Sequence, residues 1–233
     1  MTEWEYAHRG LHSDSIPENS LAASEAAIAA GMGIECDIQR SADDHPMVFH
    51  DWELERLTDG NGATENLDSN ELERLMLVGT DQSPIRLSRL IETVDGRVPL
   101  LIEIKSRPGY DVERTCELVQ SEVHHYAGDF AVMSFDPTVS EWFSKNSPET
   151  VRGLVCTDTL DHGWLSKWRE PGELQRANPD FLAVDIRDLP NDKASGWRAS
   201  GKPLLSWTIR SQQLRDRALA HVDAMISEGE GLA

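Results

Sequence analysis

The strongest constraint on the fold is a regular alternation of short apolar runs with amphipathic helical segments. The apolar, β-rich runs occupy residues 5–8, 34–38, 47–51, 99–105, 130–135, 151–156, 181–186, 203–209 and 222–227. Helical patterns lie between several of them, at 20–30, where Ser20 is a suitable N-cap, at 112–124 and at 212–220. Alternation repeated this often is typical of a parallel sheet with crossover helices.

The number of strands predicts a closed barrel. If the run at 47–51 belongs to a side hairpin, eight strands remain, and 233 residues is near the length of roughly 250 that is typical of a (β/α)₈ TIM barrel. An open doubly wound sheet is the alternative, but no strand is followed by a GxGxxG or GxxxxGK loop. We expect one domain over residues 1–233, with a small polar insertion at about 52–87. The chain stops at Ala233, so we expect the last helix to be absent or very short.

Composition limits the partners. With 22 basic and 41 acidic residues, the formal net charge is 22 − 41 = −19, and 39% of the residues are hydrophobic, which is enough for a core and excludes a disordered chain. Nucleic acids and anionic membranes require clustered Lys and Arg, so we expect neither as a partner. No apolar run approaches the ~20 residues of a membrane helix, and the N-terminus does not resemble a secretory signal, so we expect no stable membrane anchor. The three widely spaced cysteines form no CxxC pair, which favours a cytoplasmic protein with reduced thiols.

Polar side chains gather at the ends of the predicted strands. They are His8, Arg9, Glu35, Asp37, His50, Asp51, Glu103 and Lys105. Residues two apart on a strand face the same way, so Glu35 and Asp37 project together, as do Glu103 and Lys105. Two carboxylates with a third from the neighbouring strand form an oxygen site suited to Mg²⁺ or Ca²⁺. Each residue alone would more often be a solvated or hydrogen-bonded structural group. Their convergence at the carboxyl ends of strands, where barrel enzymes keep their active sites, favours catalysis.

Five segments in this order resemble the glycerophosphodiester phosphodiesterase family. They are HRG at 8–10, PENS at 17–20, GIECDI at 33–38, VFHD at 48–51 and LIEIK at 101–105. Further on, SFDP at 134–137 and WTI at 207–209 resemble later strand motifs of the family. The chain departs from the family at Ser20, where Thr is frequent, and at Ser227-Glu228, where a Thr-Asp pair is frequent.

The resemblance implies a metal-dependent hydrolase on a (β/α)₈ barrel that converts glycerophosphodiesters to glycerol 3-phosphate and an alcohol such as choline, ethanolamine or glycerol. Roles carry over by position: Glu35, Asp37 and Glu103 would bind one divalent cation, Mg²⁺ or Ca²⁺; His8 and His50 would be general acid and base; Arg9 would grip the phosphate with support from Lys105; Phe135 and Trp207 would line the pocket.

Elementary chemistry agrees with these roles. The transition state of phosphodiester cleavage accumulates negative charge, which a cation and a planar guanidinium stabilise, and an alkoxide needs a proton to leave. We expect Asp51 to orient His50 and Asn19 to hold the adjoining loop. Water and the substrate's own glycerol hydroxyl are both suitable nucleophiles.

Two alternative functions stay open at this point: a phospholipase D-like enzyme acting on intact phospholipids, and a catalytically silent barrel that binds a metal or a phosphodiester. A silent relative would be expected to lack a histidine or a carboxylate, and none is missing here.

Overall fold

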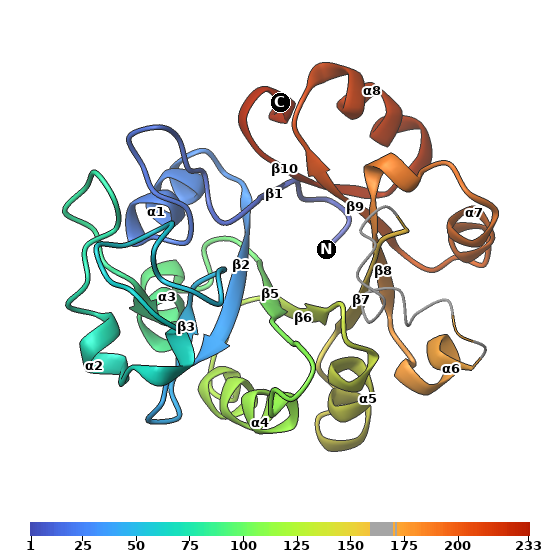
Figure 1. The fold of residues 1–233 in the computed structure, drawn as a ribbon. Coiled ribbons are helices and arrows are strands. Elements are labelled where there is room, and N and C mark those ends of the chain that lie inside the picture. Colours follow the sequence, from blue (N-terminus) through green and yellow to red (C-terminus); the bar gives the residue numbers. More distant parts are fainter. Residues whose placement is uncertain (159–169, 171) are drawn as a thin grey trace.

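Eight parallel strands close into a barrel in the computed structural model, which describes residues 1–158, 170 and 172–233. In the order around the barrel, the strands are β1 (Tyr6–Ala7), β2 (Gly33–Arg40), β5 (Leu100–Ile104), β6 (Phe130–Ser134), β7 (Arg152–Cys156), β8 (Phe181–Asp185), β9 (Leu204–Ile209) and β10 (Ala224–Ser227). The short β1 pairs in parallel with both β2 and β10 and so closes the ring. The predicted (β/α)₈ barrel is therefore confirmed, and the open sheet is excluded (Figure 1).

Helices separate consecutive barrel strands and cover the outside of the ring (Figure 1). They are α1 (Leu21–Ala29), α3 (Leu87–Val94), α4 (Val112–Val123), α5 (Pro137–Asn146), α6 (Glu173–Ala177), α7 (Asp192–Ala199) and α8 (Gln212–His221). Ser20 caps α1 as predicted, because its side chain accepts a hydrogen bond from the backbone N–H of Ala23. The chain following β10 forms only the short 3₁₀ turn η4 (Gly229–Gly231), in line with the short ending expected from the sequence.

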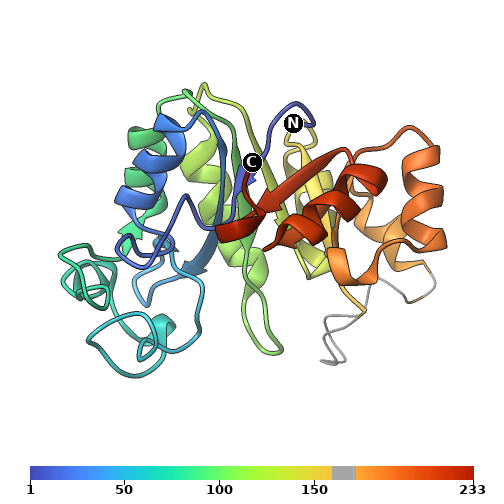
Figure 2. The same ribbon diagram turned by 90° about the horizontal axis from the view of Figure 1, so that it is seen from above.

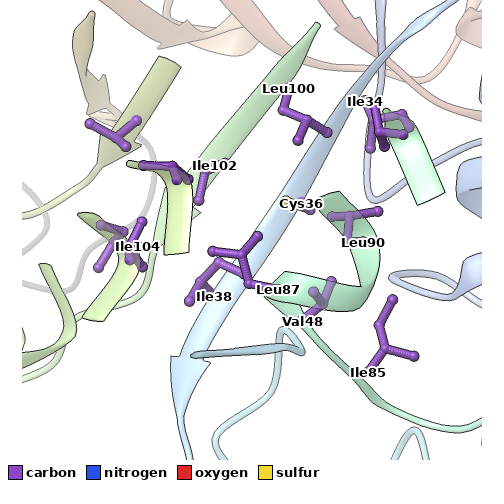
Figure 3. Packing of buried hydrophobic residues seen from close by; sticks show 14 of the residues in the cluster. Ile34, Cys36, Ile38, Val48, Ile85, Leu87, Leu90, Leu100, Ile102 and Ile104 are labelled. Atoms are coloured by element: carbon purple, nitrogen blue, oxygen red, sulfur yellow. The ribbon is translucent and has the colours of Figure 1, made fainter. Parts of the chain in front are cut away.

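The alternation of side chains along each strand separates the core from the site. On β2, Ile34, Cys36 and Ile38 pack outward with Leu100, Ile102 and Ile104 of β5 and with residues of α3 (Figure 3). The residues between them on β2 face the other way, into the barrel. A separate apolar cluster inside the barrel includes Tyr6, Leu101, Phe181 and Leu205. Each fully buried aliphatic side chain stabilises the fold by about 1.5–3 kcal/mol, so these two layers hold the strand ends in place.

The predicted run at 47–51 begins with a strand of a side hairpin, as the eight-strand count required. Here β3 (Pro46–Val48) pairs antiparallel with β2 and with β4 (Ile85–Arg86). The intervening chain contains η1 (Thr64–Asn66) and α2 (Ser69–Leu72) and has its own small core around Leu54, Leu72 and Leu77. It projects from one side of the barrel, in cyan and teal in Figure 2. The irregular segment ends at Arg86, because Leu87 begins α3 and is buried in the main core.

A further short turn, η3 (Ile186–Asp188), follows β8. Within the described part of the chain, no helix combines the length and the apolar character that a membrane span requires.

Candidate active site

Three buried carboxylates meet on the inner face of β2 and β5. Asp37 pairs in register with Glu103 of the neighbouring strand, and Glu35 precedes Asp37 by two residues on the same face. One carboxylate oxygen from each lies within 4.8 Å of the others. The residues are 2% (Glu35), 2% (Asp37) and 7% (Glu103) exposed, and burial with the neighbouring charges of Asp37 and Glu103 raises the pKa of Glu35 well above its usual value. A cluster of buried oxygen donors with excess negative charge fits a hard divalent cation.

Two cationic side chains partly balance this cluster. Lys105 Nζ lies 2.8 Å from Glu103 Oε1 and 3.3 Å from Asp37 Oδ1. Arg9 Nε lies 3.3 Å from Asp37 Oδ2. Burial alone would raise the pKa of Asp37, but the charges of Lys105, His50 and Arg9 outweigh it and hold that pKa well below its usual value. Asp37 is therefore ionised at neutral pH, with fixed positive charge beside it.

The loop after β1 brings Arg9 onto the carboxylates through a tight reversal. Arg9, Gly10 and Asn19 all have positive φ, at 57°, 78° and 54°. A Cβ on Gly10 would lie 2.8 Å from the Cβ of Ala23, so only glycine fits against α1 here. The backbone N–H of Arg9 donates to Glu35 Oε2 at 2.9 Å, and Asn19 Nδ2 donates to an oxygen of Asp37 at 2.9 Å. Asn19 thus ties the loop to β2.

His50 is held by the residue that follows it. Its Nδ1 lies 2.6 Å from Asp51 Oδ1. Arg56, from the insertion, binds both oxygens of Asp51 and also reaches Glu18 at 3.0 Å. Glu18 in turn accepts a hydrogen bond from Arg9 Nη1 at 2.7 Å. Burial would raise the pKa of Asp51, but Arg56 and His50 outweigh it and lower that pKa, so the carboxylate that orients His50 stays ionised.

His8 has a similar partner from the other end of the chain. Its Nδ1 lies 2.5 Å from Glu228 Oε2, and His12 Nε2 lies 3.3 Å from the same oxygen. Arg210 Nε contacts the other oxygen of Glu228 at 2.5 Å. Burial lowers the pKa of His8, although Glu228 opposes that shift. Burial would likewise raise the pKa of Glu228, but hydrogen bonds from His12 and His8 outweigh it and keep this pKa low.

A cavity of about 740 Å³ opens above the carboxylates at the carboxyl ends of the strands. Phe135 and Trp207 form an apolar part of its wall, packed edge to face with ring centroids 5.3 Å apart. The indole N–H of Trp207 donates to the carbonyl of Ala183 at 2.9 Å, which fixes the ring. Arg187, paired with Asp185, also lines the cavity.

The structure brings the predicted site residues together. Those that line the cavity are His8, Arg9, Asp37, His50, Glu103, Lys105, Phe135 and Trp207. Glu35 does not line it and lies beside Asp37 within the carboxylate cluster. Their roles in catalysis stay predictions.

Sequence reasoning missed several contributors. Arg187, Arg210 and Glu228 each follow a strand that the sequence did predict, so applying the strand-end rule to the later strands would have found them. Arg56 lies in the irregular insertion, where no pattern marks it.

Comparison with known proteins agrees with this geometry. The model of the glycerophosphoryl diester phosphodiesterase family matches residues 8–228. A protein of Caldanaerobacter subterraneus named glycerophosphodiester phosphodiesterase is 26% identical over 232 residues, which cover 95% of this chain and 92% of the relative. A bovine protein named glycerophosphodiester phosphodiesterase 1 is 26% identical, over 88% of this chain and 71% of the relative.

Solved structures share the fold. A phosphodiesterase of Oleispira antarctica, in complex with the product sn-glycerol-3-phosphate, superimposes with a TM-score of 0.83 at 24% identity, covering 96% of this chain and 92% of the other. A protein from Silicibacter pomeroyi described as a glycerophosphoryl diester phosphodiesterase gives 0.84 at 20% identity, covering 96% and 89%. The family match runs from His8, directly after the first barrel strand, to Glu228, directly after the last. This chain belongs to the glycerophosphoryl diester phosphodiesterase family.

Proposed function

We propose that this protein hydrolyses glycerophosphodiesters to glycerol 3-phosphate and an alcohol, with the help of one divalent cation. One observation carries the proposal. Three buried carboxylates and the two positively charged side chains of Arg9 and Lys105 lie at the base of a cavity. The cavity is also lined by two histidines, and Nδ1 of each is bound by a carboxylate. This is the arrangement that an anionic ester and acid–base chemistry require.

Glu35, Asp37 and Glu103 would hold the cation, because Mg²⁺ and Ca²⁺ prefer oxygen ligands. When bound, the ion supplies positive charge to the phosphate oxygens as their negative charge grows. A second cluster, His8, His12 and Glu228, also has ligand atoms within 4.8 Å of one another. We assign it to proton transfer instead, because it offers a single carboxylate, whereas the first cluster offers the three oxygen ligands that a hard cation prefers.

The chain's own residues then divide the work. Arg9 and Lys105 bind the phosphate, with the guanidinium of Arg9 able to contact two oxygens at once. Because Nδ1 of both histidines is occupied by a carboxylate, Nε2 is the atom that exchanges a proton with the substrate. One of His8 and His50 removes a proton from the nucleophile, and the other protonates the departing alkoxide.

The rest of the cavity receives the organic part of the substrate. Phe135 and Trp207 provide an apolar surface for its carbon chain. The glycerol 3-phosphate complex of the Oleispira relative supports a substrate of this size. We place the activity in the cytoplasm. Cys36, Cys116 and Cys156 are free thiols, which suits a reducing compartment.

The test is a panel of glycerophosphodiesters with choline, ethanolamine, serine and glycerol head groups, assayed with chelator and after Mg²⁺ or Ca²⁺ is restored. We expect release of glycerol 3-phosphate that the chelator abolishes and one of the ions restores. The Glu103→Gln variant should require a much higher metal concentration for activity, since one negatively charged ligand is lost. Glu113→Gln, on the outer helix α4, is the matched control and should leave the metal requirement unchanged. ³¹P NMR would reveal a cyclic phosphate if the glycerol hydroxyl is the nucleophile.

Two results would contradict the proposal. Hydrolysis of intact phospholipid vesicles without hydrolysis of deacylated diesters would point to the phospholipase D-like function. Binding of diesters without turnover at any metal concentration would point to a silent binding barrel.

A further inference from the structure

We infer that Gln39 is a positioning residue that fixes the backbone of His50; the inference rests on the catalytic role proposed for His50. Gln39 is fully buried, with 0% of its surface exposed. Its side-chain amide Nε2 donates toward three consecutive carbonyl oxygens, those of Phe49 at 3.3 Å, His50 at 2.9 Å and Asp51 at 2.5 Å. One amide therefore serves the whole segment that carries His50 and the carboxylate bound to it.

The position of Gln39 follows from strand geometry. It is the next residue after Glu35 and Asp37 on the inward face of β2, because side chains alternate along the strand. The proposed cation ligands and the support of His50 thus project from the same strand, at consecutive inward positions. Any movement of the His50 segment relative to Gln39 is also a movement relative to these carboxylates.

The His50 segment needs such a support. Residues 49–51 come directly after β3 and belong to no helix or strand. The backbone N–H of Phe49 still donates to the carbonyl of Asp37 at 2.9 Å, but within the described part of the chain no backbone N–H donates to the carbonyls of residues 49–51. Phe49 is buried and His50 and Asp51 are half-buried, and carbonyls withdrawn from water require a donor, which Gln39 provides. The hydroxyl of Thr64 adds one more hydrogen bond to the carbonyl of Asp51, at 3.0 Å.

The carbonyl oxygen of the Gln39 side chain has no comparable set of contacts. Its Oε1 is buried and accepts no hydrogen bond from any residue that the structure describes. Leaving a buried acceptor unpaired destabilises a fold. The polar contacts of this side chain within the described chain all go to residues 49–51, so its replacement should act on His50 before it acts on any other part of the site.

The first test compares Gln39→Met, which keeps the length but has no donor, with Gln39→Glu, which keeps the shape but turns an oxygen toward the three carbonyls. We expect kcat to fall about 10- to 100-fold in both, because a displacement of about 1 Å at a reacting group has an effect of this size. KM should change little, since within the described chain no hydrogen bond joins the Gln39 side chain to Arg9 or Lys105. The matched control is Ser140→Ala, which removes another buried hydrogen bond from a side chain to a carbonyl, at Gly153, and should leave kcat unchanged.

A double-mutant cycle separates positioning from general damage to the fold. Gln39→Met is combined with His50→Ala, and the wild type, both single variants and the double variant are assayed on the same glycerophosphodiester at high enzyme concentration, so that residual turnover is measurable. If Gln39 acts through His50, the loss caused by Gln39→Met should disappear in the His50→Ala background. If Gln39→Met does not fold, Gln39→Asn, which keeps the amide on a shorter side chain, takes its place.

Each outcome decides the matter. An equal loss of kcat with and without His50, or no loss in the presence of His50, overturns the role of Gln39 and leaves the proposed function intact. Full activity of His50→Ala overturns the proposed role of His50, and the role of Gln39 with it.

Discussion

The two histidines of the cavity have similar surroundings that are built in different ways. In each, Nδ1 is bound by a carboxylate that is itself paired with an arginine. For His50 the carboxylate is the next residue in the chain, and the arginine is five residues beyond it. For His8 the carboxylate is Glu228, 220 residues away, and the two meet because β1 and β10 pair. The local pair depends on a short segment of chain, whereas the distant pair depends on closure of the barrel.

Burial is a second difference between them. The side chain of His8 is 11% exposed, and that of His50 is 29% exposed. Desolvation therefore weighs on His8 and lowers its pKa, while Glu228 works against this shift. The two histidines should respond differently when their carboxylates are removed.

Removing either imidazole should have the largest effect. His8→Ala and His50→Ala should each lower kcat/KM by roughly 10²- to 10⁴-fold, as expected for loss of a general acid or base. Circular dichroism would show whether both variants remain folded. An activated aryl leaving group sharpens the comparison, because only the variant that lacks the general acid should recover activity on it. Near-normal turnover by either variant on the natural diesters would remove that histidine from the mechanism.

Removing the carboxylates should have an intermediate effect. Glu228→Gln and Asp51→Asn should each lower kcat about 10- to 100-fold, a size typical of groups that orient a reacting side chain. Glu228→Gln should also lower the pKa of His8 further, because the negative charge that favours the imidazolium is gone. The limb of the pH–rate profile that reports protonated His8 should then move to lower pH. Glu230→Gln, at an exposed position two residues away, is the control. An unshifted profile in Glu228→Gln would show that Glu228 does not control His8.

Removing the arginines should have the smallest effect. Arg56 and Arg210 are half-exposed, and pairs of this kind contribute about 0.2–1 kcal/mol, a factor of roughly 1.4 to 5 in rate if all of it acts on catalysis. Arg56→Ala should cost more than Arg210→Ala, because Arg56 joins Asp51 to Glu18 and so to Arg9. Steady-state assays at low and high salt would measure the loss of rate in both variants. High salt should bring the rates of the two variants closer to that of the wild type, because it screens exposed charges. A larger loss of rate in Arg210→Ala than in Arg56→Ala would show that the arginine near His8 contributes more than the arginine near His50.

Much of this site was predictable because it follows from the period of a strand. The alternation of Ile34, Cys36 and Ile38 with Glu35 and Asp37 separates a core face from a polar face without knowledge of any partner. Gln39 continues the polar face, so its inward direction could have been read from the sequence. Its role could not, because the three carbonyls that it binds come from a segment that turns back beside β2.

Two other features escaped prediction. The helix α3 begins directly after the polar insertion and was not predicted, although Leu87, Leu90 and Val94 have the spacing of a buried helix face. Glu228 looked like a departure from a family motif at the end of the chain, with nothing nearby to suggest His8 as its partner.

The sequence alone determined the number and direction of the strands, the inward carboxylates and the local pair of His50 with Asp51, since all of these depend on neighbours within a few residues. Tertiary structure decided which ends of the chain meet. Closure of the ring through β1 and β10 places Glu228 on His8, and the return of residues 49–51 places three carbonyls on Gln39. Contacts of this kind depend on the path of the whole backbone, because hydrogen bonds between strands join residues that no local pattern connects.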